Sequence, residues 1–187
     1  MAPRDENNPP SYIPCRTEAF HHNTDWERSW RLARLPGLDS EQITFLWRLL
    51  HCLLPTLERV NRLNQNTSPI CKHCNDQVIE DIPHALISCS YNREITQSLM
   101  DTVGLSQPIS IMSKVLTLDF EMEEKMEFPL VWLISNFLKK VWDIRKQKKK
   151  RCDLVRVRAD LEARVSLLRE SRLSELATII SQLLSNM

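Results

Sequence analysis

The feature that most constrains this chain is a set of cysteine and histidine residues placed close together. Cys71, Cys74, His84 and Cys89 follow the spacing C-x2-C-x9-H-x4-C. Thiolate sulfur and imidazole nitrogen are common ligands of a tetrahedral zinc ion, and a structural site uses four protein ligands. The spacing therefore predicts one structural zinc ion held by these four side chains.

The two ligand pairs are expected to come from different local structures. The two residues between Cys71 and Cys74 allow both sulfurs to face one point from a tight turn. Asp81 suits the N-cap of a short helix, and Pro83 suits its first turn. The second pair is five residues apart, which is not one stripe of an α-helix. We therefore expect that turn to unwind, or Cys89 to lie just past the helix end.

Other interpretations of these residues stay open. Cysteines without a metal behave as small buried hydrophobic residues. A CxxC pair in a reducing compartment also serves redox chemistry, but the βαβ pattern typical of that use is missing. A disulfide is disfavoured because the sequence shows no secretory signal. His73 is either a substitute ligand or a solvated neighbour of the site.

Glycine is scarce, which limits the possible folds. Only Gly37 and Gly104 occur in 187 residues, whereas an average protein contains ~7% glycine. This excludes a glycine-rich phosphate loop and favours helices joined by polar, proline-containing loops. The formal net charge is +1, so any nucleic-acid binding must depend on local charge. No run of eighteen apolar residues occurs, so we expect no membrane span and an intracellular protein, nuclear or cytoplasmic.

Composition divides the chain into four predicted segments. Residues 1–38 are expected to form a largely disordered or loosely packed arm, with a short helix near Trp26. Residues 39–104 should form a helical hairpin with the zinc-binding module, and residues 105–128 an acidic linker. Residues 129–187 should form a C-terminal helical hairpin or coiled-coil-like region. The predicted fold class is mainly α, a zinc-stabilised helical module followed by a long C-terminal helical hairpin.

Capping signals and apolar spacing predict the helices before the zinc motif. Asp39 and Gln42 have the spacing of a capping box. Pro55 ends this helix, and Thr56 begins a second one, so we expect a helical hairpin. The apolar positions at helical spacing in the first helix are Ile43, Leu46, Trp47, Leu50 and Leu54.

The C-terminal part combines apolar periodicity with uneven charge. Acidic residues between Asp119 and Glu127 are interpreted as a solvated helix start. A helix is predicted from Pro129, and a last long helical stretch should fold back on it or pair with another chain. Between residues 139 and 151, eight basic residues occur with one acidic residue, Asp143.

The residues around the zinc motif resemble a known family. Residues 45–51 read FLWRLLH, residues 54–56 read LPT, and Glu58-Arg59 follow before the C-x2-C pair. This order resembles the zinc-binding region C-terminal to the reverse transcriptase domain of LINE-type (non-LTR) retrotransposons. The resemblance runs from about Trp30 to Leu99. The wide Cys74–His84 spacing and the missing glycine differ from retroviral zinc knuckles, so knuckle-like base recognition is not implied.

The resemblance implies a non-catalytic module that binds nucleic acid, RNA in preference to DNA. The polymerase would lie upstream, and no Tyr-x-Asp-Asp-like run occurs here, so no catalytic residue is assigned. Some LINE-type proteins carry a restriction-like endonuclease after this region, but the surroundings of residues 123–125 do not predict the strands it needs. The chain would be a fragment, a truncated element copy or an element-derived protein.

Candidate contacts to nucleic acid are basic residues on both sides of the zinc motif, with one tryptophan as a stacking partner. Further expected partners are a reverse transcriptase domain, in cis or in trans, and a second copy of the chain through the C-terminal helices. The alternative function is a zinc-stapled protein-interaction or oligomerisation domain without nucleic-acid binding. The candidate contacts are Arg48, Arg59, Arg62, Lys72, Arg93, Lys139, Lys140, Trp142, Arg145, Lys146, Lys148, Lys149, Lys150 and Arg151.

Overall fold

The computed structural model describes residues 24–102, 115–119, 124–147 and 153–185. Within these ranges the fold is mainly α, as predicted, and a single isolated β-bridge joins Ile70 and Ile79. No helix in the described ranges is long and apolar enough to cross a lipid bilayer. The helices are α1 (Trp26–Leu32), α2 (Ser40–Leu50), α3 (Leu57–Leu63), α4 (Arg93–Thr102), α6 (Glu124–Lys146), α7 (Leu154–Glu170) and α8 (Ser174–Ser185), with short turns η2 (His84–Ser88) and η3 (Ser90–Asn92).

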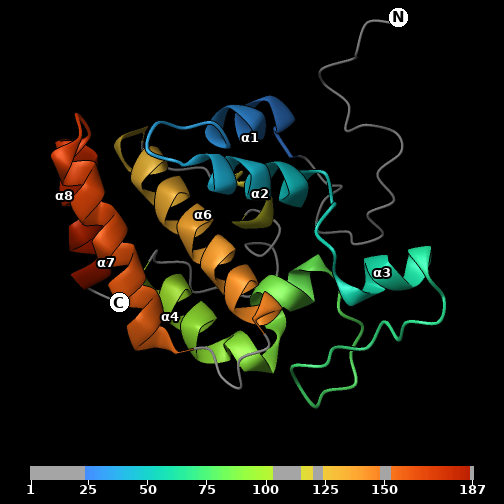
Figure 1. Cartoon of the computed structure of the whole chain (residues 1–187). Coiled ribbons are helices and arrows are strands. Elements are labelled where there is room, and N and C mark those ends of the chain that lie inside the picture. The colour runs from blue at the N-terminus through green and yellow to red at the C-terminus, as the bar shows by residue number, and fades with distance from the viewer. Residues whose placement is uncertain (1–23, 103–114, 120–123, 148–152, 186–187) are drawn as a thin grey trace, which may run out of the picture.

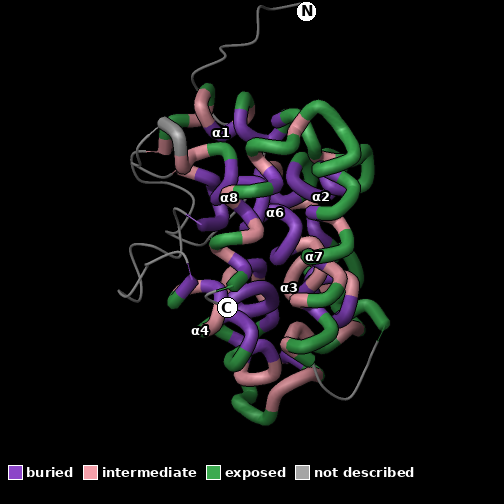
Figure 2. Tube along the Cα trace, turned by 90° about the vertical axis from the view of Figure 1, so that its left-hand side faces the viewer, coloured by how far each residue is buried: buried purple, intermediate pink, exposed green. Residues whose placement is uncertain are grey.

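Helix α6 lies at the centre of the fold (Figure 1). Helices α2, α7 and α8 pack against it, and η2 of the zinc-ligand segment contacts it as well. All residues from 129 to 138 are buried, as expected for a helix enclosed by others on every side. The buried parts of the trace accordingly gather inside the molecule and the exposed parts outside (Figure 2). The helix begins at Glu124, so Pro129 lies inside it and not at its start.

One hydrophobic core joins the described parts of the chain. It includes Leu32 from the predicted arm, Leu46 from the zinc-binding segment, Val115 from the predicted linker and Leu133 from the C-terminal region. The four predicted segments therefore contribute side chains to a single core. Residues 24–38 form part of this packed structure, since α1 and the turn after it bury several of their side chains.

Helix α2 begins as its capping signals predict. The Asp39 carboxylate accepts from the backbone N–H of Gln42, and the Gln42 side chain accepts from that of Asp39. The buried face of α2 differs from the apolar face that the sequence predicts. The Gln42 side chain lies on this buried face and donates a hydrogen bond to Asn136 of α6. Ile43 and Trp47, expected inside, are instead 36% and 47% exposed. The helix also ends earlier than expected, at Leu50.

Both helices predicted before the zinc motif are present, but the second one lies outside the hydrophobic core. Helix α3 has no buried residues, and Figure 1 shows it projecting to the side of the molecule. Leu63 at its end is 80% exposed. Its first turn is fixed by Glu80, whose carboxylate accepts from Leu57 N and whose backbone oxygen accepts from Glu58 N. Helix α3 is thus attached to the zinc-ligand segment at one end.

The C-terminal region is helical, as predicted, but its last stretch consists of two helices. Helix α7 ends where Ser171 takes an extended conformation with φ −96° and ψ −179°, and α8 starts at Ser174. The two helices lie side by side, and both pack against α6 (Figure 1). The buried side chains of this pair are Val157, Leu161, Val165, Leu168, Ala177, Ile180 and Leu184.

Two acidic residues before the basic region have a packing role that the sequence did not indicate. Glu127 Oε1 lies 2.5 Å from Arg28 Nη2, and Asp119 Oδ1 lies 3.7 Å from Arg28 Nη1. Both carboxylates are largely shielded from solvent. Asp119 connects α1 to the segment before α6, and Glu127 connects α1 to the first turns of α6, so these two residues are not a fully solvated helix start.

Candidate metal centre

The first two cysteines lie in a short loop that the chain closes on itself. Cys71 N donates to Val78 O at 2.9 Å, and Glu80 N donates to Pro69 O at 2.9 Å. These bonds flank the isolated bridge and hold Cys71 and Cys74 in the loop between its two sides. The backbone N–H of His73 points toward Cys71 Sγ at 3.4 Å.

The second ligand pair comes from a wide turn, as the five-residue spacing predicted. Asp81 Oδ1 accepts from His84 N at 2.8 Å, which confirms the predicted cap. Residues 84–88 then form a single π-helical turn, in which Cys89 N donates to His84 O at 3.0 Å. Cys89 itself lies just past the turn with φ −63° and ψ 129°. The widened turn directs the imidazole and the last sulfur to the same side.

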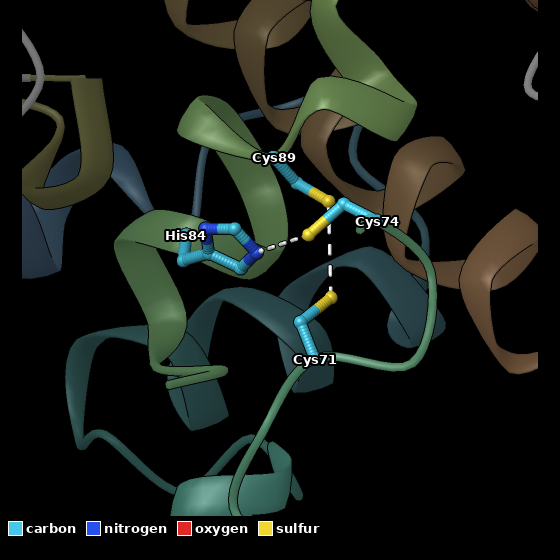
Figure 3. Close-up of side chains that lie close together, drawn as sticks. All are labelled: Cys71, Cys74, His84 and Cys89. Atoms are coloured by element: carbon cyan, nitrogen blue, oxygen red, sulfur yellow. Dashed lines mark hydrogen bonds between the residues drawn. The ribbon is translucent and has the colours of Figure 1, made fainter. Parts of the chain in front are cut away.

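The four side chains converge on one point (Figure 3). Their ligand atoms all lie within 4.8 Å of one another. Cys71 Sγ is 3.9 Å from Cys89 Sγ, and Cys74 Sγ is 3.4 Å from His84 Nε2. A tetrahedral zinc ion with ordinary bond lengths requires edges of about 3.8 Å between sulfurs and about 3.6 Å between sulfur and nitrogen. The donor set and its spacing therefore suit one zinc ion.

The surroundings of the cluster indicate a structural site. Cys71, His84 and Cys89 are buried, and Cys74 is half-buried. Four protein ligands fill a tetrahedral coordination sphere, whereas hydrolytic zinc keeps one position for water. When bound, zinc would join the loop that carries Cys71 and Cys74 to the turn that carries His84 and Cys89.

Neighbouring residues hold the ligand segments together. Ser90 Oγ donates to Asp76 Oδ2 at 2.9 Å, linking the cysteine loop to the residue after Cys89, and this bond lowers the pKa of Asp76. Asn92 Nδ2 donates to Ala85 O at 2.7 Å in the buried interior. Burial raises the pKa of the Cys74 thiol to about 12. Binding of zinc as thiolates must therefore release protons.

His73 lies beside the site and is not among the four clustered ligands. Its ring centroid is 5.1 Å from that of Tyr91. Burial and the positive charge of Arg145 lower the pKa of His73. The structure thus supports a neighbouring position and not a substitute ligand.

An ion pair beside the cluster has no signal in the local sequence. Arg145 Nη2 donates to Glu80 Oε2 at 2.6 Å and points toward Cys71 Sγ at 3.4 Å. Burial lowers the pKa of Arg145, but bonding to the Cys71 and Cys89 sulfurs and the charge of Glu80 outweigh it, so the pKa is raised. The sequence does carry one signal for the burial of Arg145. Arg145 stands seven residues after Leu138, so both residues lie on the same apolar stripe of α6.

Two residues that were predicted to contact nucleic acid have buried side chains instead. Arg145 and Trp142 are 4% and 7% exposed. A run of basic residues is typical of a surface, but the end of α6 still packs one face against the fold, and both side chains lie on that face. Neither side chain is presented to a phosphate or a base in this structure.

Three other cations in the C-terminal half of α6 pair with carboxylates. Lys139 pairs with Asp143 and Glu41, and Lys140 pairs with Asp160. Lys146 Nζ lies 2.8 Å from Asp143 Oδ1. The predicted basic footprint is therefore largely neutralised over the described part of α6. Four more of its predicted members, Lys148, Lys149, Lys150 and Arg151, lie outside the described residues.

The predicted contacts nearer the zinc motif have different surroundings. Arg59 is half-buried and donates to Cys52 O at 3.2 Å, and Arg62 pairs with Glu58 within α3. Arg48, Lys72 and Arg93 are exposed. Lys72 lies between the first two metal ligands, and Arg93 begins α4 shortly after the last one.

Comparison with known proteins identifies the segment that holds the cluster. No curated protein sequence and no solved structure matches the chain. Residues 15–95 match the family described as zinc-binding in reverse transcriptase. The match contains all four clustered ligands, and it ends before α6. Residues 15–95 are therefore similar to the zinc-binding domain of reverse transcriptases.

Proposed function

We propose that this chain is a non-catalytic, zinc-stabilised module that binds nucleic acid, with RNA as the preferred partner. The family of residues 15–95 supports this proposal, because reverse transcriptases act on nucleic acid. The closed set of four protein ligands supports a structural and not a hydrolytic metal. From the resemblance to LINE-type elements we also propose a reverse transcriptase domain as a partner, in cis or in trans. Three zinc-binding thiols require a reducing environment, so we propose a nuclear or cytoplasmic location.

The observation that supports the proposal most is the set of exposed cations in the matched segment. Arg48, Lys72 and Arg93 have no ion pair with a carboxylate among the described residues. An unpaired surface cation is available to a phosphate, and phosphate contacts release counterions and supply most of the non-specific affinity. The zinc site fixes the backbone that carries Lys72 and Arg93.

An aromatic group on α2 adds a surface on which bases can stack. Trp47, next to Arg48, is 47% exposed. The His51 ring centroid lies 4.3 Å from that of Trp47 and 4.5 Å from that of Trp30. Exposed aromatic rings beside cations are typical of proteins that bind single strands, where stacking contributes about 1–3 kcal/mol per base.

The test is fluorescence anisotropy with a labelled single-stranded RNA, the DNA of the same sequence and the corresponding duplex, each at two salt concentrations. We expect the RNA to bind most tightly and affinity to fall with salt. Replacing Arg48, Lys72 and Arg93 with glutamine should weaken binding at least tenfold. The salt slope should decrease by about 0.7 for each lost contact. Trp47→Ala should weaken single-strand binding without changing the salt slope.

Two further variants make this test specific. Replacing Arg156, Arg158 and Arg172 removes the same charge from the C-terminal region and should leave RNA affinity almost unchanged. Replacing Lys146, Lys148, Lys149 and Lys150 measures what the C-terminal basic run contributes. Zinc content is measured for every variant, so that loss of the metal is not mistaken for loss of a contact. Absence of binding at low salt, or equal loss from the matched control, contradicts the proposal.

The alternative function, association with protein, is supported by two apolar side chains on the surface of α7. Val155 and Leu167 are 76% and 66% exposed. Because α7 also contributes to the core, deletion of the C-terminal helices would disrupt folding and could not test association. Replacing Val155 and Leu167 with serine and measuring mass by light scattering is the suitable experiment. A dimer that the replacement dissociates would favour this alternative.

A further inference from the structure

Arg145 brings a guanidinium group from the central helix to the metal cluster. Its side chain is 3% exposed, and its Nη2 lies 2.6 Å from Glu80 Oε2. The same nitrogen lies 3.4 Å from Cys71 Sγ. Nη1 is also buried and has no hydrogen-bond partner in the described part of the chain. A cation is stable at such depth only when negative groups are close to it.

Glu80 accounts for part of this arrangement. Its other oxygen accepts from Leu57 N at 3.3 Å, so it also holds the start of α3. One carboxylate balances the charge of Arg145 but leaves its second nitrogen without an acceptor. Zinc with three thiolates and one imidazole carries one net negative charge, which resides on the sulfurs. The cluster would therefore supply the additional negative partner that this guanidinium lacks.

We propose that Arg145 is an outer-shell hydrogen-bond donor to the zinc-bound thiolates, so that zinc binding and the docking of α6 stabilise each other. Hydrogen bonds to ligand atoms fix their orientation and raise metal affinity. Helix α6 lies beyond the matched residues 15–95, so the zinc-binding domain is completed by a residue outside that match. Thermodynamic linkage requires the coupling to act equally in both directions.

The first test measures zinc affinity by competition with a chelator, using the full-length chain. Arg145→Met keeps the length of the side chain and removes its charge and donors. We expect affinity to fall about 10- to 100-fold, the usual range for outer-shell partners. Lys139→Met is the matched control, because it removes another largely shielded cation of α6 that pairs with Asp143. It should change zinc affinity less than about twofold.

A second variant removes the risk that an unpaired Glu80 prevents folding. Arg145→Met combined with Glu80→Gln leaves no buried charge at this position, and such replacements are often tolerated. The glutamine oxygen can still accept from Leu57 N. The double variant should fold and still lose zinc affinity. Unchanged affinity in this variant would overturn the proposal.

Two measurements separate an effect on the sulfurs from simple packing. In the cobalt-substituted protein, the sulfur-to-metal charge-transfer band should shift in Arg145→Met and not in Lys139→Met. In the unmodified protein, zinc removal should accelerate amide hydrogen exchange in residues 139–147 as well as in residues 71–89. An unshifted band, or faster exchange confined to residues 71–89, would show that Arg145 only fills space.

Discussion

Gly37, in the turn between α1 and α2, shows how closely single residues are fitted in this fold. Its φ of +85° lies in the left-handed region, which residues with a side chain rarely adopt. A Cβ atom placed there would lie 3.0 Å from Leu168 Cδ2 and 3.1 Å from Leu173 Cδ1. Its carbonyl accepts from Trp132 Nε1 at 2.9 Å. One glycine thus allows the first turn, α6 and the C-terminal helices to meet.

Gly37→Ala should therefore lower the free energy of unfolding by about 1–3 kcal/mol. Left-handed backbone costs roughly 1–2 kcal/mol for a residue with a side chain, and the two leucines must also move. Urea denaturation followed by circular dichroism measures the change. Ser40→Ala, at an exposed position nearby, is the control and should change stability by less than about 0.5 kcal/mol. Equal stability of Gly37→Ala and the parent protein would contradict this account of the turn.

Asp39 acts at the scale of elements, since it caps α2 and also contacts α7. Its Oδ2 accepts from Arg164 Nη1 at 2.7 Å. Burial raises the pKa of Asp39, but the bonds from Arg164 and Gln42 N lower it more, so the pKa is below its ordinary value. A lowered pKa means that the carboxylate stabilises the fold above the unfolded-state pKa of about 3.9. That contribution is lost as pH falls through the lower folded-state value.

Asp39→Ala should cost about 1 kcal/mol at neutral pH, the usual effect of losing an N-cap. The difference from the parent protein should shrink as the pH falls below about 4, because Asp39 is then protonated first in the unfolded chain and, at lower pH, in the folded protein. Asp39→Asn keeps a capping oxygen and loses only the charge, so it should cost less. Urea denaturation at several pH values measures all three proteins. A constant difference between Asp39→Ala and the parent down to pH 2 would contradict the assignment.

Local chemistry in the sequence predicted the starts of elements better than their packing. The capping box at Asp39, the cap at Asp81 and the widened turn before Cys89 depend on neighbouring residues, and all three are present. Periodicity alone could not show which partner an apolar face would find. Periodicity therefore locates α3 in the sequence but does not show that it lies outside the core, and a run of basic residues does not show that Arg145 lies on a buried stripe. Long-range partners such as Glu80 leave no local signal.

The described residues share one hydrophobic core, and the metal cluster borders it. Ala85, Leu86 and Ile87 stand between the last two ligands, and all three belong to the core that also contains α6 and the C-terminal helices. A change in the turn that holds His84 must therefore displace core side chains. Metal removal should disturb more than the cysteine loop.

Removing zinc with a strong chelator should lower Tm by about 10 °C or more. A stability change of 1 kcal/mol shifts Tm by about 2–4 °C in a chain of this size, and structural zinc is bound with a large free energy. Circular dichroism measures both Tm and helix content, which should fall beyond the ligand segment. Cys74→Ser should behave like the chelated protein, whereas Cys52→Ser, outside the cluster, should retain one zinc by elemental analysis. If the parent protein contained no zinc and Cys74→Ser kept its Tm, the four residues would be buried cysteines and a histidine without a metal.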